Sequence, residues 1–198
     1  LANSLKFMEE CDSPDQMRGI EGEAAVQYFN VLDDLILQQK ENFYFKNRNK
    51  RPPLDNVNAM LSFAYTLLAG ECRHALEVVG LDSYVGFLHA DRPGRASLAL
   101  DLMEELRPHF ADRFVLSLIN RNEVAETDFE FQSSGAVYLS AQSRKKFLSS
   151  WQNRKKEKIM HPFLKEKIEW GLVPYCQALL LARTIRGDLD GYPPFLWK

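Results

Sequence analysis

The sequence has 198 residues, of which 45% are hydrophobic and 26% are charged. A chain of this length and composition can bury a core of its own, which excludes a disordered protein and a small disulfide-stapled scaffold. Its 25 Lys and Arg residues nearly balance 27 Asp and Glu residues, and the net charge of −2 excludes a uniformly basic coat for nucleic acid. Three widely spaced cysteines indicate a reducing compartment.

The N-terminal segment is acidic where a signal peptide would be apolar, so we expect no export. No run approaches the roughly 18 apolar residues that a membrane helix needs, and we expect no membrane partner. The first residue is Leu1 rather than Met, which suggests a piece of a longer chain.

Apolar residues recur at helical spacing along most of the chain. We expect Asp55 to cap a long helix that stops at Gly80, and Pro108 to end a shorter one. The predicted helices cover residues 20–39, 56–79, 97–106, 109–121, 141–158 and 161–186. Alternating residues at 129–131 and 137–139, around a turn with Gly135, predict a hairpin. The fold class is therefore mainly α, a multi-helix domain with one small β-hairpin.

Charge is segregated along the chain. Residues 144–167 hold nine basic residues against two acidic ones, and a second basic run covers residues 40–51. Acidic residues gather at 9–34 and 101–130. These runs could form a basic face for a polyanion, or they could be ordinary solvated helix faces.

Glu71 falls within the apolar face of the long helix, about 40° from Val57 at 100° per residue. A charge in that position must be neutralised, paired or bound to a cation. Either a buried ion pair with an Arg or a helix face that opens into a cleft would satisfy it.

Asp101 and Glu104 are neighbours on the next helix, and an apolar segment before them delivers His89. Oxygen ligands with one nitrogen suit Mg²⁺ or Mn²⁺ better than structural zinc. Arg92 and Arg95, in a tight turn beside His89, could grip phosphate oxygens. An ordinary acidic face and a structural histidine are the alternatives.

Several segments together resemble one family. They are Arg18 to Gly22, Asn58 to Tyr65, Gly80 to His89, Asp91 to Arg95, Ser97 to Glu105, and Gly135 to Leu139 leading into Arg144 to Phe147. These motifs are similar to the CRISPR adaptation integrase, the metal-dependent endonuclease and integrase subunit that inserts new spacers. The ending, Gly191 to Trp197, is similar to type I members.

The resemblance implies that Glu71, His89 and Glu104 hold Mg²⁺ or Mn²⁺ and are catalytic, with Asp101 as a further acid near the metal or a ligand itself. It also implies that residues 18–198 are the helical catalytic domain. Residues 1–17 would then be a linker or first helix after an N-terminal β domain that this chain lacks.

In this reading the metal activates water, or a DNA 3′-hydroxyl, for attack on a phosphodiester. The implied partners are DNA, namely protospacer and CRISPR repeat or leader, a second copy in the full-length protein, and a small ferredoxin-like adaptation subunit, all in a prokaryotic cytoplasm. The predicted DNA-binding residues are Tyr84, Arg92, Arg95, Arg144, Lys145, Lys146, Arg154, Lys155, Lys156 and Lys158. Two alternatives remain: a non-catalytic helical DNA-binding or scaffold module, and a protein-interaction adaptor.

Overall fold

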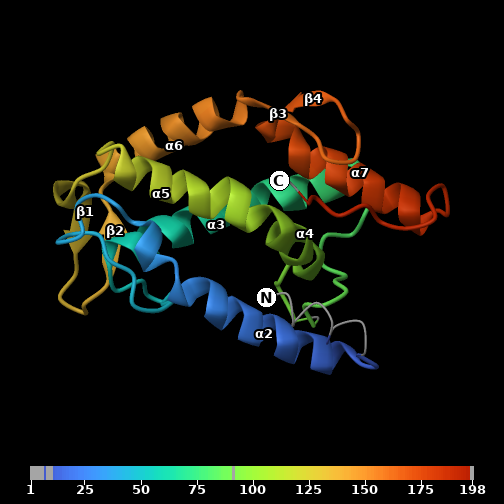
Figure 1. Ribbon diagram of the computed structural model, residues 1–198, viewed down its shortest axis with the longest axis horizontal. Coiled ribbons are helices and arrows are strands. Elements are labelled where there is room, and N and C mark those ends of the chain that lie inside the picture. The colour runs from blue at the N-terminus through green and yellow to red at the C-terminus, as the bar shows by residue number, and fades with distance from the viewer. Residues whose placement is uncertain (1–6, 8–10, 91, 197–198) are drawn as a thin grey trace.

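The structure, a computed structural model, describes residues 7, 11–90 and 92–196. It is helical, with α2 and α6 along opposite sides and α3 and α5 between them (Figure 1). The elements in chain order are α2 (Pro14–Asn30), η1 (Asp33–Leu35), α3 (Asn56–Val78), α4 (Ser97–Arg107), η2 (Pro108–Asp112), α5 (Arg113–Asn120), η3 (Glu126–Asp128), β1 (Phe129–Phe131), β2 (Val137–Leu139), α6 (Ala141–Lys155), β3 (Lys158–Met160), β4 (Lys167–Glu169), η4 (Trp170–Leu172) and α7 (Val173–Ile185). The mainly α prediction is confirmed.

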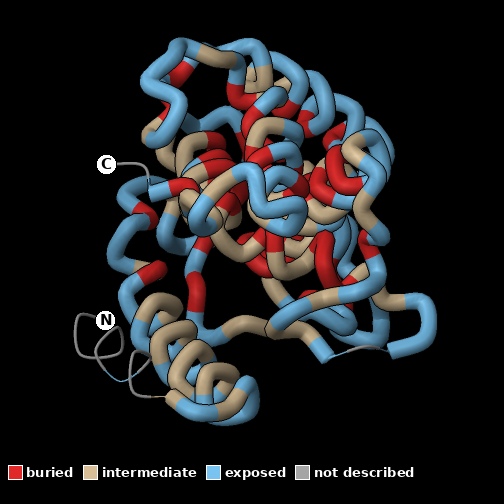
Figure 2. The backbone as a smooth tube through the Cα atoms, turned by 90° about the vertical axis from the view of Figure 1, so that its right-hand side faces the viewer, coloured by how far each residue is buried: buried red, intermediate tan, exposed pale blue. Residues whose placement is uncertain are grey.

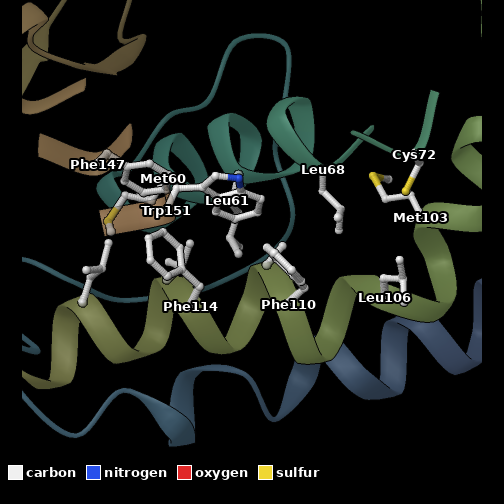
Figure 3. Close-up of a cluster of buried hydrophobic side chains, with 14 of the residues drawn as sticks. Met60, Leu61, Leu68, Cys72, Met103, Leu106, Phe110, Phe114, Phe147 and Trp151 are labelled. Carbon is white, nitrogen blue, oxygen red and sulfur yellow. The ribbon is translucent and has the colours of Figure 1, made fainter. Parts of the chain in front are cut away.

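Helix α3 is the centre of the core. Asp55 caps it by accepting a hydrogen bond from the backbone amide of Asn58, as predicted. Its buried face packs against α4, α5 and α7, and Figure 3 shows aliphatic side chains of α3 opposite the aromatic rings of the neighbouring helices. The Trp151 ring lies 4.8 Å from that of Phe110 and 5.2 Å from that of Phe114, so α6 closes the core from the other side.

Pro108 does not end the helical segment, contrary to the prediction. The chain continues through a π-helical turn, η2, directly into α5. A π turn is wider than an α turn, and it accommodates the proline ring and the missing amide donor. The turn also carries Asp112, which is fully buried.

The first predicted helix, at 20–39, is wrong in its bounds. Ser13 caps α2 by accepting the backbone amide of Gln16, and Pro14 lies in the first turn. The helix ends at Asn30. Leu32 and Ile36 of the predicted apolar face are buried, but they reach the core from the two ends of η1, as its N-cap and C-cap residues. The predicted boundary at residue 17 falls inside α2, and most of the predicted linker over residues 1–17 lies outside the described residues.

The predicted hairpin is present, with Phe129 opposite Leu139 and Gly135 at φ +82° in its turn. A second hairpin pairs Ile159 with Ile168 where the prediction continued the helices at 141–158 and 161–186. Because this hairpin takes up residues 158–169, α6 ends at Lys155 and α7 begins at Val173.

Among the described helices, none is both long and apolar enough to cross a bilayer.

The loop over residues 81–96 is fastened to the start of α4. The Ser83 carbonyl oxygen accepts the backbone amides of Leu98 at 3.0 Å and Ala99 at 3.2 Å, and so caps the helix. Gly86 of this loop lies directly against α4. A Cβ atom on Gly86 would be 2.7 Å from Ser97 Cβ and 2.9 Å from Asp101 Oδ2. Only glycine lets the loop approach α4 this closely.

A buried polar cluster fastens the C-terminal segment. His161 Nδ1 accepts the backbone amides of Phe163 and Leu164, while its Nε2 faces Gln177 Oε1 at 3.1 Å. This pattern requires the neutral imidazole with its proton on Nε2. Gln177 in turn donates to the Glu105 carboxylate, which also accepts the backbone amide of Phe195.

We expect Gly86→Ala to lower the free energy of unfolding by about 1–3 kcal/mol, because the added methyl group overpacks the contact between loop and helix. Gly70→Ala is the matched control. Gly70 is exposed on α3 and has nothing within 4 Å of an added Cβ, so its replacement is neutral or stabilises by up to about 1 kcal/mol. Urea unfolding measures the free energy of unfolding of both variants. Equal effects of the two substitutions would contradict the close contact between Gly86 and α4.

Burial lowers the pKa of His161, and the hydrogen bond to Gln177 opposes this only in part. As the pH falls, His161 therefore takes up a proton at a higher pH in the unfolded chain than in the folded one. The free energy of unfolding decreases as the pH drops below about 6.5. His161→Asn keeps an acceptor for the two amides but does not titrate. Unfolding measured from pH 7 to pH 5 should show a shallower loss in this variant than in the wild type. Identical slopes would contradict the buried neutral imidazole.

Candidate functional site

Asp101 organises the loop that carries His89. Its Oδ2 accepts the backbone amides of Phe87 at 2.6 Å and Leu88 at 3.1 Å, and its Oδ1 accepts the amide of His89 at 3.0 Å. Oδ1 also lies 2.7 Å from His89 Nδ1. The sequence offered Asp101 as a further acid near the metal or a ligand itself. In the structure its carboxylate accepts four donors and so shapes the loop.

The contact with Asp101 determines which nitrogen of His89 is available. An ionised carboxylate can only accept hydrogen bonds, so Nδ1 is the donor, and in the neutral imidazole the lone pair is on Nε2. The same arrangement orients imidazole ligands in metal sites. His89 is partly exposed and lines a cavity of about 440 Å³.

Glu104 lines the same cavity from α4. Both its oxygens bond to Arg107, at 2.6 Å and 3.1 Å. Burial raises the pKa of the Glu104 carboxyl, the Arg107 guanidinium lowers it, and the neighbouring Glu21 carboxylate raises it again. The repulsion between the two carboxylates is the electrostatic condition that a bound cation would relieve.

Glu21, which the sequence interpretation did not single out, lines this cavity from α2. It lies in the motif Arg18 to Gly22 that carries part of the family resemblance, so the signal was present in the sequence. The structure therefore brings together Glu21, His89 and Glu104, from three separate segments.

Helix α2 has no buried residue, and Figure 2 shows it in the colours of intermediate and exposed positions only. Besides the packing of Tyr28 and Phe29 against the core, two hydrogen bonds attach it to other elements. Arg18 Nη1 donates to the Leu88 carbonyl oxygen at 2.9 Å, and the Tyr28 hydroxyl donates to Asp112 Oδ2 at 2.7 Å. The first contact joins α2 to the loop that holds His89, which places Glu21 beside it.

Glu71 is not brought to this cavity, and the predicted trio of Glu71, His89 and Glu104 does not assemble. Its Oε1 accepts the Trp151 indole N–H at 2.9 Å and lies 3.0 Å from Lys155 Nζ. Ala69 faces the cavity of His89, whereas Glu71 lies 200° further round α3 at 100° per residue and faces α6. The half-buried charge is satisfied by an ion pair, with a Lys rather than the Arg that one of the two alternatives named.

As the side chains lie, no three His, Cys, Asp or Glu residues within the described ranges converge closely enough to hold a metal ion. Glu21, His89 and Glu104 share a cavity rather than a finished coordination sphere.

The predicted DNA-binding residues differ in their contacts. Lys146 pairs with Asp128, Arg154 with Glu157, and Lys155 with Glu71. Arg95 bonds to Ser97 and to the Ala90 carbonyl oxygen, and so shapes the turn. Tyr84 and Arg92 are exposed in the loop over residues 81–96. Four further cations are exposed and have no carboxylate partner within the described part of the chain: Arg144, Lys145, Lys156 and Lys158.

Comparison with known proteins places the chain in a family. The profile described as "CRISPR associated protein Cas1" matches residues 1–153. A CRISPR-associated endonuclease Cas1 of Rhodospirillum rubrum is 58% identical over 193 residues, which are 98% of this chain and 56% of that protein. The chain thus spans about half the length of this relative.

Two solved structures have the same architecture. A casposase bound to its integration product superposes with a TM-score of 0.86 at 28% identity, over 96% of this chain and 53% of that one. A Cas6-RT-Cas1–Cas2 complex superposes with a TM-score of 0.82 at 26% identity, over 100% of this chain and 21% of that one. The chain belongs to the Cas1 family of CRISPR-associated proteins.

Proposed function

We propose that this chain is the catalytic part of a metal-dependent DNA endonuclease and integrase of CRISPR adaptation. It inserts new spacers through attack of a DNA 3′-hydroxyl on a phosphodiester. Family membership supports this proposal, as do the printed name of the R. rubrum relative, an endonuclease, and the casposase structure with its integration product. The type I assignment stays a prediction.

One observation carries the proposal: Glu21, His89 and Glu104 line one cavity, and Asp101 fixes the His89 tautomer. Two carboxylates and one imidazole with a free Nε2 are a donor set that suits Mg²⁺ or Mn²⁺. We therefore assign Glu21 the role that the resemblance gave to Glu71, and keep His89 and Glu104. A bound ion would supply charge stabilisation at a phosphodiester oxygen and activation of a hydroxyl or water.

The protein residues contribute orientation and charge. Asp101 holds the His89 ring in place, and the bidentate contact with Arg107 holds the Glu104 carboxylate. Arg48 is anchored on Asn58 and Ser62 at the other side of the cavity. Its guanidinium and that of Arg107 make the cavity wall attractive to phosphate oxygens.

Arg144, Lys145, Lys156 and Lys158, which are exposed and meet no carboxylate among the described residues, would hold the duplex through its phosphates, with little reading of bases. Protospacer and CRISPR repeat or leader DNA are the proposed substrates. A second copy and a small ferredoxin-like adaptation subunit are the proposed protein partners, and the similarity to a Cas1–Cas2 assembly supports the latter.

We expect Glu21→Gln and His89→Asn each to abolish Mn²⁺ binding, measured by calorimetry, and Mn²⁺-dependent cleavage of branched DNA. Both changes remove a proposed ligand. Glu71→Gln is the matched control, because its carboxylate is paired with Lys155 in a different cavity and should leave Mn²⁺ affinity unchanged. Loss of Mn²⁺ binding in Glu71→Gln alone would instead support Glu71 as the metal ligand. DNA binding that is indifferent to EDTA, with no bound metal, would favour the scaffold module instead.

We expect the double substitution Lys156→Gln and Lys158→Gln to reduce the slope of log affinity against log salt for duplex DNA by about 1.8, because two phosphate contacts are lost. Fluorescence anisotropy in EDTA at several salt concentrations measures this slope. Lys40→Gln serves as the control, since the Lys40 ammonium is already bonded to Asp33. An unchanged slope in the double variant would remove these lysines from the DNA interface.

A further inference from the structure

A fully buried carboxylate, that of Asp112, lies behind the wall of the cavity of His89. Its Oδ1 accepts the Tyr65 hydroxyl at 2.5 Å, and its Oδ2 accepts the Tyr28 hydroxyl at 2.7 Å. Tyr65 lines the cavity, whereas Asp112 does not. A buried charge is tolerated only where polar groups compensate it, and two tyrosine hydroxyls do so here.

The π turn η2 brings Asp112 to this wall. Asp112 follows Glu104 by eight residues, which in an uninterrupted α-helix would place it about 80° further round the axis. A π turn holds one residue more than an α turn, so the residues after it lie about 100° further back. Asp112 therefore lies within about 20° of the face that carries Glu104. Such turns are frequent at functional sites.

Through Tyr65, Asp112 supports the guanidinium group that holds Glu104. Arg107 donates to Glu104 from both terminal nitrogens, whereas its Nε has no hydrogen-bond partner in the described part of the chain. The guanidinium carbon also packs over two aromatic rings, 5.4 Å from the centre of the Tyr65 ring and 6.0 Å from that of Phe29. If the Tyr65 ring shifts, the guanidinium and the carboxylate bonded to it can shift as well.

Through Tyr28, Asp112 fastens the helix that carries Glu21. Tyr28 follows Glu21 by seven residues, two turns along α2 on the same face. On the other side of Glu21, Arg18 donates to the Leu88 carbonyl oxygen. Glu21 thus lies between two fastened points, one on the loop of His89 and one on Asp112.

We infer that Asp112 is a positioning residue for the proposed metal site, because it holds the Glu21 and Glu104 carboxylates at their separation without touching the ion. Two carboxylates repel each other when no ion lies between them, so groups behind them must keep them together. The inference rests on the proposed function, which makes these carboxylates ligands together with His89. A residue that only stabilises the fold would change the free energy of unfolding and leave the metal affinity of the folded chain unchanged.

The test measures Mn²⁺ affinity by calorimetry and the free energy of unfolding in urea for the same variants. Tyr28→Phe and Tyr65→Phe each remove one hydroxyl that Asp112 accepts and keep the ring. We expect each to weaken Mn²⁺ binding by about tenfold, the lower end of the loss usual for groups that orient metal ligands. Asp112→Asn keeps the shape but loses one acceptor and the charge, and should weaken binding by at least the same factor.

Tyr192→Phe is the matched control. The Tyr192 hydroxyl is also held by a carboxylate, that of Glu105, but neither residue lines the cavity of His89. This variant should lower the free energy of unfolding and leave Mn²⁺ affinity unchanged. Wild-type Mn²⁺ affinity in Tyr28→Phe and Tyr65→Phe would overturn the inference, and so would a tenfold loss in Tyr192→Phe.

A second readout needs no metal. Amide hydrogen exchange in the metal-free chain reports the local opening of α2. Tyr28→Phe should speed exchange across α2 by about tenfold, the value of one hydrogen bond to a charged group, and Tyr192→Phe should not. Unchanged exchange in Tyr28→Phe would overturn the inference.

Failure of this inference is distinguishable from failure of the proposed function. If Glu21→Gln and His89→Asn abolish Mn²⁺ binding but the two tyrosine variants bind as tightly as the wild type, only the positioning role fails. If Mn²⁺ binding survives Glu21→Gln and His89→Asn, the metal assignment fails. Exchange in α2 then decides whether Asp112 holds Glu21 in place.

Discussion

The site depends on the Asp101 carboxylate. It accepts the backbone amides of Phe87, Leu88 and His89 together with the His89 ring N–H, and so turns an exposed loop into a fixed support. Gly86 allows the close approach that these hydrogen bonds need. The Leu88 carbonyl, held in this way, accepts the hydrogen bond from Arg18 that brings α2 and Glu21 to the cavity. One charged residue on α4 therefore holds the loop of His89 and, through Leu88 and Arg18, contributes to the position of Glu21.

Glu71 and Glu21, two acids on helical faces, differ in the cavity that each of them lines. Glu71 has its charge compensated by Lys155 and the Trp151 indole, and it fastens α6 to α3. Glu21 belongs to a helix without buried residues. Glu104 is also paired, with Arg107, yet it lines the cavity of His89, so the cavity that an acid lines rather than its pairing separates the proposed ligands from Glu71.

Local patterns predicted much of the fold. Asp55 before α3 and the turn around Gly135 have clear signatures, and both elements form as predicted. The π turn at Pro108 and the pairing of Ile159 with Ile168 depend on packing against distant segments, which helical spacing alone does not encode. The His89 loop and Glu104 were recognised from their motifs. Glu21 lies in one of those motifs too, but its place beside His89 depends on tertiary contacts of α2, among them those of Arg18, Tyr28 and Phe29, which local spacing does not encode.

The most direct test of the proposed site is diffraction from crystals of this chain soaked in Mn²⁺, with data collected at the manganese absorption edge. We expect an anomalous peak beside His89 Nε2, within the cavity shared with Glu21 and Glu104. A peak beside Glu71 and Lys155, or none near His89, would contradict it.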